Sequence, residues 1–253
     1  MSASRSRAEH PNLQLDATIE FLQRGLPRPP ATVLDVGCGR GEVAQRLGRL
    51  GYEVTAIDVD RRAVAAARRH GVPAILADFL SYRAGPYDAC VFVFSLHHLS
   101  PLSSAVRRAR LLLRPDGRLL VNDKAWEAAD ASTAAWLYDN LRVLRSAGIA
   151  HAPRSLPTPG QSPLSFWRGK HLGVEHPGRK MVHEIQSRFV VQNIERVPYL
   201  YWNLGSLVKG SRRLAVSRSL LEIERQRIRD GNLRPLGLQI VAINHSPSAS
   251  PPA

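Results

Sequence analysis

The chain has 253 residues, of which 44% are hydrophobic and 22% are charged, and both values are ordinary for a folded globular protein. No apolar run approaches the roughly 18 residues that cross a bilayer, and residues 1–10 carry arginines without the apolar stretch of a secretory signal. The two cysteines, Cys38 and Cys90, show neither a pairing pattern nor metal-ligand spacing, which favours a reducing, cytoplasmic setting.

The formal net charge is +14, and the basic excess is larger in the C-terminal part of the chain. Residues 151–253 hold 15 Lys+Arg against 6 Asp+Glu, whereas residues 1–150 hold 20 against 15. A solvated basic surface produces such a balance as readily as a nucleic-acid patch does. The charge therefore leaves nucleic acid open as a less favoured partner.

Short apolar strands alternate with helices along the first half of the chain. Strands are predicted over residues 31–36, 53–58, 73–77, 87–94 and 118–123. Helices are predicted over residues 16–24, 42–49, 61–70 and 103–113. Strand and helix alternating in this way indicate an α/β fold, with a doubly wound, mostly parallel sheet covered by helices.

The regular alternation lapses after residue 125. Residues 126–146 look helical, and residues 151–180 hold five prolines and four glycines, so we expect a long irregular segment there. A helix over 180–188 and a basic amphipathic helix within 205–231 follow. Strands are predicted over residues 189–201, with a bend at Pro198, and 236–244.

The most informative motif is the loop of residues 33–41, which reads VLDVGCGRG. A strand that turns into a helix through glycines brings the backbone close to a ligand. Asp35 would repel the pyrophosphate of a dinucleotide, but it would favour S-adenosylmethionine, which carries a sulfonium and an ammonium group. The third glycine comes too early for a G-x-G-x-x-G loop, and no P-loop lysine follows.

Further polar residues follow the next strands, at the edge where ligands of open α/β sheets bind. Asp58 ends the second strand and can accept hydrogen bonds from ribose hydroxyls. Asp78 and Phe79 follow the third strand, where an acid with an aromatic ring or a backbone N–H can contact adenine. Ser95 and the pair His97-His98 follow the fourth strand.

Five motifs in this order resemble those of class I S-adenosylmethionine-dependent methyltransferases, and most closely those of the UbiE-like small-molecule group. They lie within residues 30–125 and read VLDVGCGRG, AIDVD, ADF, YDACVFVFSLHHL and LRPDGRLLV. The resemblance implies a Rossmann-like seven-stranded sheet with an antiparallel final strand. It also implies that S-adenosylmethionine, which becomes S-adenosylhomocysteine, is the cofactor.

The resemblance implies a cofactor site that extends along this edge. Its expected members are Asp35, Gly37, Cys38 and Gly39 at the methionine part, Asp58 and Val59 at the ribose and adenine, Asp78 and Phe79 at the adenine, and Ser95 and His98 nearby. His97 is the candidate catalytic base. No metal is expected, because adjacent histidine side chains point in different directions and no third ligand is evident close by in the sequence.

Aromatic residues are concentrated between residues 124 and 202. Trp126, Phe166 and Trp167 are the candidates for the wall of a substrate pocket. We therefore expect a core over 1–125, a helical or irregular lid over 126–185, completion of the sheet over 186–245, and a disordered tail over 246–253.

The expected function is methyl transfer to an oxygen or nitrogen of a natural product, lipid or quinone-like acceptor. One alternative is an RNA methyltransferase that uses the basic C-terminal helix, although no D/N-P-P-Y/F tetrapeptide or Pro-Cys nucleophile is present. Another is a non-catalytic relative that serves as an interaction subunit. The oligomeric state stays open, a homodimer included.

Overall fold

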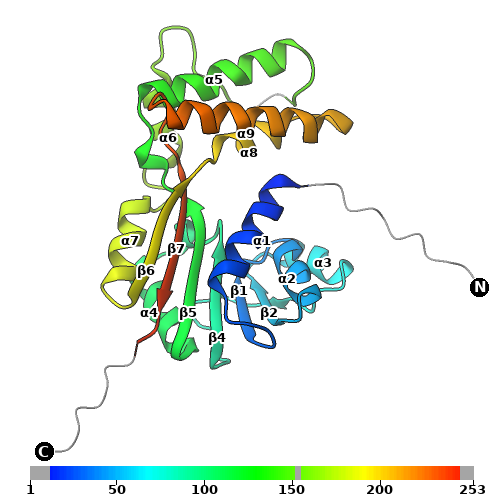
Figure 1. Cartoon of the computed structure of the whole chain (residues 1–253), viewed down its shortest axis with the longest axis vertical. Helices are drawn as coiled ribbons and strands as arrows, with labels where there is room; N and C mark the ends of the chain where they lie inside the picture. The colour runs from blue at the N-terminus through cyan, green and yellow to red at the C-terminus, as the bar shows by residue number, and fades with distance from the viewer. Residues whose placement is uncertain (1–11, 152–154, 246–253) are drawn as a thin grey trace, which may run out of the picture.

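The computed structural model describes residues 12–151 and 155–245, so the expected disordered tail lies outside the described residues. A single sheet in the order β3-β2-β1-β4-β5-β7-β6 forms the centre of the molecule (Figure 1). Its strands are β1 (Thr32–Val36), β2 (Glu53–Asp58), β3 (Ile75–Leu76), β4 (Tyr87–Val93), β5 (Leu113–Lys124), β6 (Val190–Val197) and β7 (Gly237–Ile243).

The first five strands pair in parallel, and β7 runs antiparallel to both β5 and β6. This topology confirms the predicted Rossmann-like seven-stranded sheet with an antiparallel final strand: β7 is the last strand of the chain and lies between β5 and the edge strand β6. All five parallel strands end at one edge, here called the carboxyl edge. The loops expected to bind ligands therefore lie together there.

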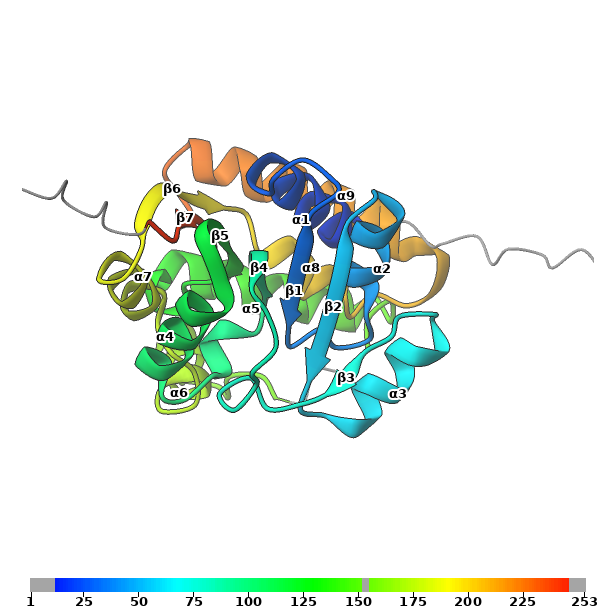
Figure 2. The ribbon, with the colours of Figure 1, turned by 90° about the horizontal axis from the view of Figure 1, so that it is seen from below.

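Helices cover both faces of the sheet. Helices α1 (Leu13–Gly25), α2 (Glu42–Arg49) and α3 (Arg61–Arg69) pack on one face, and α4 (Leu102–Leu112) and α7 (Gly178–Gln186) pack on the other. Figure 2 shows α1 and α4 on opposite sides of the strands. Because successive strand residues point to opposite faces, Val33 packs beneath α1 while Leu34 joins the cluster around α4.

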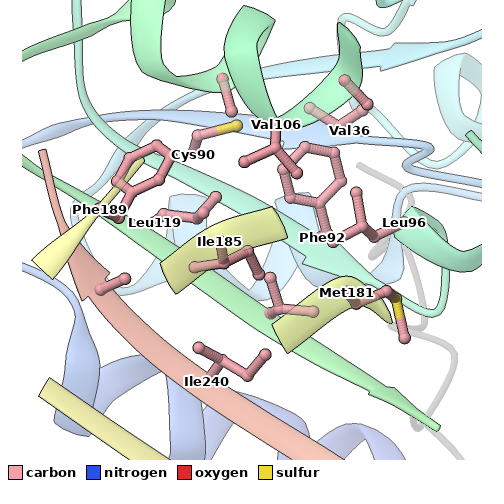
Figure 3. Packing of buried hydrophobic residues seen from close by; sticks show 14 of the residues in the cluster. Val36, Cys90, Phe92, Leu96, Val106, Leu119, Met181, Ile185, Phe189 and Ile240 are labelled. Atoms are coloured by element: carbon pink, nitrogen blue, oxygen red, sulfur yellow. The ribbon is translucent and has the colours of Figure 1, made fainter. Parts of the chain in front are cut away.

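The cluster on the α4 face joins both halves of the chain. Figure 3 shows Phe92 and Leu119 of the strands beside Met181 and Ile185 of α7. Both α7 residues are fully buried. Thus α7, which the sequence assigns in part to the lid, covers the sheet.

A second apolar cluster forms a helical cap beyond the carboxyl edge (Figure 1). The cap consists of the 3-10 turn Trp126–Ala128 and of α5 (Ala131–Ser146), α6 (Pro163–His171), α8 (Leu200–Gly205) and α9 (Arg213–Arg229). It therefore uses two stretches of chain, whereas the sequence places a lid within 126–185 alone. Among the described residues, no helix is long and apolar enough to span a membrane.

The structure corrects three sequence predictions in the second half. The expected irregular segment contains α6, which begins where the Ser162 side chain accepts a hydrogen bond from Ser165 N–H. The expected helix over 126–146 is interrupted, because Asp130 caps α5 at Thr133 N–H. The expected strand over 189–201 ends at Val197.

The end of β6 is decided by a residue that is distant in sequence. The buried carboxylate of Glu224, on α9, accepts hydrogen bonds from the backbone N–H groups of Tyr199, Leu200 and Tyr201 at 2.7–3.0 Å. These are the unpaired donors of the first turn of α8, which a carboxylate stabilises. This tertiary contact favours a helix where apolar and aromatic residues by themselves indicate a strand.

Candidate functional site

The glycine loop follows β1 and bends back beneath the end of β2. Gly37 and Gly39 have φ of +70° and +54°, a conformation that favours glycine. A Cβ atom on Gly37 would lie 2.6 Å from Cβ of Ser95, so the loop and the end of β4 approach too closely for a larger residue. Ser95 is itself held, because its hydroxyl donates to the Val36 carbonyl at 2.6 Å.

Asp35 lies on β1 directly before this loop and is 1% exposed. Its Oδ2 atom has no hydrogen-bond partner among the residues that the structure describes. Burial first, and the nearby Asp58 second, raise the pKa of Asp35 to about 7. An unsatisfied buried carboxylate is costly, so this position favours a ligand that brings positive charge or hydrogen-bond donors.

Asp58 ends β2 and connects two parts of the edge. One of its carboxylate oxygens accepts the Gly39 N–H and the other accepts the Asp60 N–H, both at 2.8 Å. The next residue, Val59, is 67% exposed. Asp35, the glycine loop and Asp58 are thus brought together as the sequence expects.

The structure corrects the expected contribution of Phe79. Its ring is 2% exposed and packs edge-on against Phe92 with a centroid separation of 5.3 Å. A ring in the core cannot cover adenine, which leaves only the backbone of Phe79 at the edge. Asp78 is exposed, and its carboxylate accepts the Leu80 N–H at 2.9 Å.

His97 lies in the 3-10 turn Leu96–His98 after β4 and is 3% exposed. Its Nδ1 lies 2.6 Å from Oδ1 of the fully buried Asp123, although the ring N–H is not aligned as a hydrogen bond requires. The backbone N–H of His97 donates to the other oxygen of Asp123 at 3.2 Å. Asp123, which sequence reasoning missed, therefore fixes both the backbone and the ring of His97.

The rings of His97 and His98 do not diverge as the sequence predicts. Their centroids are 3.9 Å apart with an interplanar angle of 45°. Burial and the neighbouring His97 lower the pKa of His98. The neutral form of this exposed ring is accordingly favoured.

Residues 171–176, here called the edge segment, close over this histidine pair. Oε1 of Glu175 lies 2.9 Å from Nζ of Lys124 and 3.8 Å from Nε2 of His97, while Oε2 lies 2.7 Å from Nδ1 of His171. Burial opposes ionisation, but hydrogen bonds from His171 and Lys124 outweigh it and lower the pKa of Glu175 to about 2. His176 adds a backbone hydrogen bond to the His97 carbonyl at 2.9 Å.

Sequence reasoning missed Lys124, His171 and Glu175 for different reasons. Lys124 ends β5 at the carboxyl edge, so its place in the strand order could have identified it. His171 and Glu175 follow a stretch that is rich in proline and glycine, and only tertiary packing brings them to His97.

The three expected pocket residues belong mainly to the packing of the cap. Trp126 and Trp167 are 5% and 4% exposed, and Trp167 Nε1 donates to the Trp126 carbonyl at 2.8 Å. The Trp126 ring stacks on His171 at a centroid separation of 5.6 Å. Phe166 packs edge-on against Tyr138.

Buried polar atoms without a partner are concentrated at the carboxyl edge. Five buried side-chain atoms in residues 12–151 and 155–245 lack a well-aligned hydrogen bond, and four of them lie at this edge: Asp35 Oδ2, His97 Nδ1, Trp126 Nε1 and His171 Nε2. His97 Nδ1 still has the Asp123 carboxylate 2.6 Å away, so three of the four have no described partner. Buried polar groups are nearly always satisfied in folded proteins, so this concentration is typical of a site that receives a ligand. A cleft of about 680 Å³ opens nearby between the cap and α1 and α2, and Arg40 and Trp202 are among its lining residues.

Comparison with known proteins agrees with this geometry. A family model described as a methyltransferase domain matches residues 8–155. Ubiquinone biosynthesis O-methyltransferases from Xylella fastidiosa and Caulobacter vibrioides are 33% identical over 113 residues and 31% identical over 117 residues. These alignments cover 41% and 42% of this chain, and 46% of each relative, so the match spans about half the length of these curated proteins.

Solved structures share the fold at low sequence identity. Geranyl diphosphate C-methyltransferase from Streptomyces coelicolor, crystallised with S-adenosylhomocysteine, is 17% identical with a TM-score of 0.59, over 90% of this chain and 80% of that one. Phosphoethanolamine N-methyltransferase 2 from Haemonchus contortus, crystallised with S-adenosylmethionine, is 14% identical with a TM-score of 0.59. The superposition covers 91% of this chain and 53% of that one. The cyclase SpnF has the same TM-score at 17% identity, and the superposition covers 96% of this chain and 86% of that one.

The family model covers more than half of the chain, and it includes the glycine loop, both acids that meet there and the histidine pair. The seven-stranded sheet with its antiparallel β7 is the one that the resemblance implies. The chain therefore belongs to the methyltransferase-domain family, and its sheet has the class I fold.

Proposed function

We propose that this protein transfers the methyl group of S-adenosylmethionine to an oxygen or nitrogen atom of a small-molecule acceptor. The observation that carries the proposal is the buried, unpartnered carboxylate of Asp35 beside the glycine loop. When bound, S-adenosylmethionine supplies a methyl group on a positively charged sulfur, which is displaced as the acceptor attacks. The protein mainly positions the acceptor and excludes water.

The residues of the edge fit this cofactor. Asp35 offers a negative charge in a site of low polarity, where a pyrophosphate would be repelled and a cationic ligand is favoured. The backbone of Gly37, Cys38 and Gly39 forms a cradle in which a Cβ atom at Gly37 would clash with Ser95. We assign these residues to the methionine part of the cofactor.

We assign the nucleoside part to the neighbouring strand ends. The carboxylate of Asp58 is held at the loop by two backbone hydrogen bonds, where it can accept hydrogen bonds from ribose hydroxyls. Val59, Asp78 and the backbone of Phe79 would contact the adenine. Ser95 and His98 would complete the wall on the acceptor side.

His97 is the proposed general base for an acceptor that enters with its proton. Asp123 lies against Nδ1 and orients the ring, so the remaining Nε2 is the atom that can take the acceptor proton. Because His97 is 3% exposed beneath the edge segment, the acceptor has to displace Glu175 or its neighbours to reach it. Trp126, Phe166 and Trp167 would then border the acceptor from the cap.

The names of the relatives support one class of acceptor. Several carry names that refer to O-methylation in ubiquinone biosynthesis, and a hydroxylated, quinone-like aromatic compound is therefore the acceptor that we favour. The low pKa of Glu175 keeps its carboxylate ionised at neutral pH, beside Lys124 and close to His97. Such surroundings suit an acceptor whose hydroxyl ionises readily.

A second candidate acceptor is RNA, because α9 and the residue before it carry several exposed arginines. Arg212, Arg218, Arg225, Arg227 and Arg229 are exposed, and none of them forms an ion pair with another described residue. An affinity for RNA that falls steeply with salt concentration would favour this candidate.

We place the protein in the cytoplasm, because Cys38 and Cys90 are both free thiols.

Isothermal calorimetry with S-adenosylmethionine, S-adenosylhomocysteine and NAD tests the proposal. We expect the first two to bind and NAD to give no heat. Methyl transfer is then measured by the mass gain of hydroxylated quinone-like compounds, with amines and RNA as the other arms. Binding of NAD in place of both S-adenosyl compounds would overturn the proposal.

A further inference from the structure

Three side chains at the edge are close enough to share one metal ion. His97, His98 and Glu175 each offer one ligand atom, and these atoms lie within 4.8 Å of one another. Nε2 of His97 and Oε1 of Glu175 are 3.8 Å apart. Two ligands of a tetrahedral zinc ion with bonds of about 2.1 Å are roughly 3.4 Å apart, so His97 and Glu175 need only a small contraction, and the ring of His98 has to turn toward them.

Two of the three candidate ligands are oriented by a second polar group, as metal ligands usually are. A metal-binding histidine commonly presents its other ring nitrogen to a carboxylate, and Nδ1 of His97 lies 2.6 Å from Oδ1 of Asp123. The second oxygen of Glu175 lies 2.7 Å from Nδ1 of His171. The atoms left over, His97 Nε2 and Glu175 Oε1, face each other, and the exposed His98 gives a path from solvent.

Lys124 supplies the positive charge that the cluster contains at present. Its Nζ lies 2.9 Å from Oε1 of Glu175, and both side chains are 11% exposed. A divalent ion at this oxygen would replace the ammonium group and provide the same compensation. The long lysine side chain can turn away when the ion binds, because four single bonds connect its charge to the backbone.

We propose that His97, His98 and Glu175 bind a divalent transition-metal ion, with Lys124 displaced from Glu175. Two imidazole nitrogens and one carboxylate oxygen suit Zn²⁺ or Co²⁺, whereas Mg²⁺ and Ca²⁺ prefer oxygen ligands throughout. The bound ion occupies Nε2 of His97, the atom proposed above to accept the acceptor proton. The ion therefore inhibits methyl transfer reversibly, and this last statement rests on the proposed function.

Titration of the tag-free, full-length protein with Co²⁺ tests the binding, with the visible absorption of the bound ion as the readout. We expect one ion per chain. His98→Ala and Glu175→Gln should each weaken binding at least 10-fold, and Asp123→Asn should weaken it by about 10- to 100-fold. His183→Ala, which removes an exposed histidine of α7, is the matched control and should change nothing.

Lys124→Met is a control that distinguishes loss of a metal ligand from misfolding. Removing the competing ammonium group should strengthen Co²⁺ binding, a gain that a damaged fold would not produce. Circular dichroism and thermal unfolding establish that each variant is folded. A wild-type protein that binds no Co²⁺, or binding that survives both His98→Ala and Glu175→Gln, overturns the proposal.

An activity measurement tests inhibition by the bound ion separately from binding of the ion. With an acceptor in hand, Zn²⁺ should inhibit the wild-type enzyme over the concentration range in which it binds. Inhibition should be weaker for Glu175→Gln, measured relative to that variant's own rate without metal. Binding without inhibition overturns the inhibitory part alone. If the protein fails to bind S-adenosylmethionine, the proposed function fails, while the Co²⁺ titration still decides whether the ion binds.

Discussion

The sheet and the cap are stabilised in different ways. The central strands of the sheet are buried between helices on both faces, and their apolar side chains form a cluster on each side. The cap has an apolar centre too, but its course depends on a buried carboxyl group, that of Glu224, which accepts hydrogen bonds from the start of α8. The candidate site lies where the two meet, and three buried polar atoms without a described partner are there. Apolar packing supports the site, and polar side chains from both regions complete it.

The largest effect should come from Asp35, the carboxyl group that the sheet buries. Burial raises its pKa from 3.8 to about 7, so the folded protein retains a proton that the unfolded chain releases in this range. Stability should therefore fall as pH rises from about 4 to 7, by roughly 4 kcal/mol in total. Asp35→Asn cannot ionise. Without ligand, it should be more stable than the wild type above pH 7 in urea unfolding, with a flatter pH dependence.

The same substitution should harm ligand binding. Loss of a charged partner is worth about 1.5–3 kcal/mol, so the affinity of Asp35→Asn for S-adenosylmethionine should fall at least 10-fold in calorimetry. A variant that is more stable and also binds as tightly as the wild type would show that Asp35 does not face the cofactor.

Glu224→Ala should separate the cap from the sheet. It leaves the buried N–H groups of Tyr199, Leu200 and Tyr201 without their acceptor, at a cost of about 3 kcal/mol. Hydrogen exchange should accelerate at residues 199–201 and along α8, while the amides of β1 and β4 stay protected. Glu222→Ala, an exposed change on the same helix, is the control. Uniform loss of protection in sheet and cap would mean that the two regions unfold as one unit.

His97→Gln tests the candidate site where the sheet and the cap meet. A general base typically contributes 10²- to 10⁴-fold, so kcat should fall about 100-fold for an acceptor hydroxyl, with less change in cofactor affinity. Asp123→Asn, which acts by positioning His97, should lower kcat and shift its pH profile. An unchanged rate in His97→Gln would mean that the acceptor enters without its proton.

The smallest effect is expected at the start of α6. Ser162→Ala removes the cap on the Ser165 N–H, whose hydrogen bond is long at 3.4 Å, and should cost about 0.5 kcal/mol in urea unfolding. A loss of several kcal/mol would show that α6, and not Glu224, controls the stability of the cap.

The sequence by itself determines the sheet and the cofactor edge, because their signals are local. The glycines of residues 37–41 require positive φ, Asp35 and Asp58 lie at or next to the ends of neighbouring strands, and parallel strands place their ends at one edge. An apolar run such as residues 87–94 also indicates its own burial. Each of these properties can be read within about ten residues.

The tertiary structure alone decides the rest. Glu224 converts the end of a predicted strand into α8, and Glu175 reaches His97 from 78 positions away in the chain. Phe79 enters the core because Phe92 provides an apolar neighbour, although its place after a strand indicates the ligand edge. Such choices depend on which polar group finds a buried partner, and that partner is identified only when distant segments of the chain pack together.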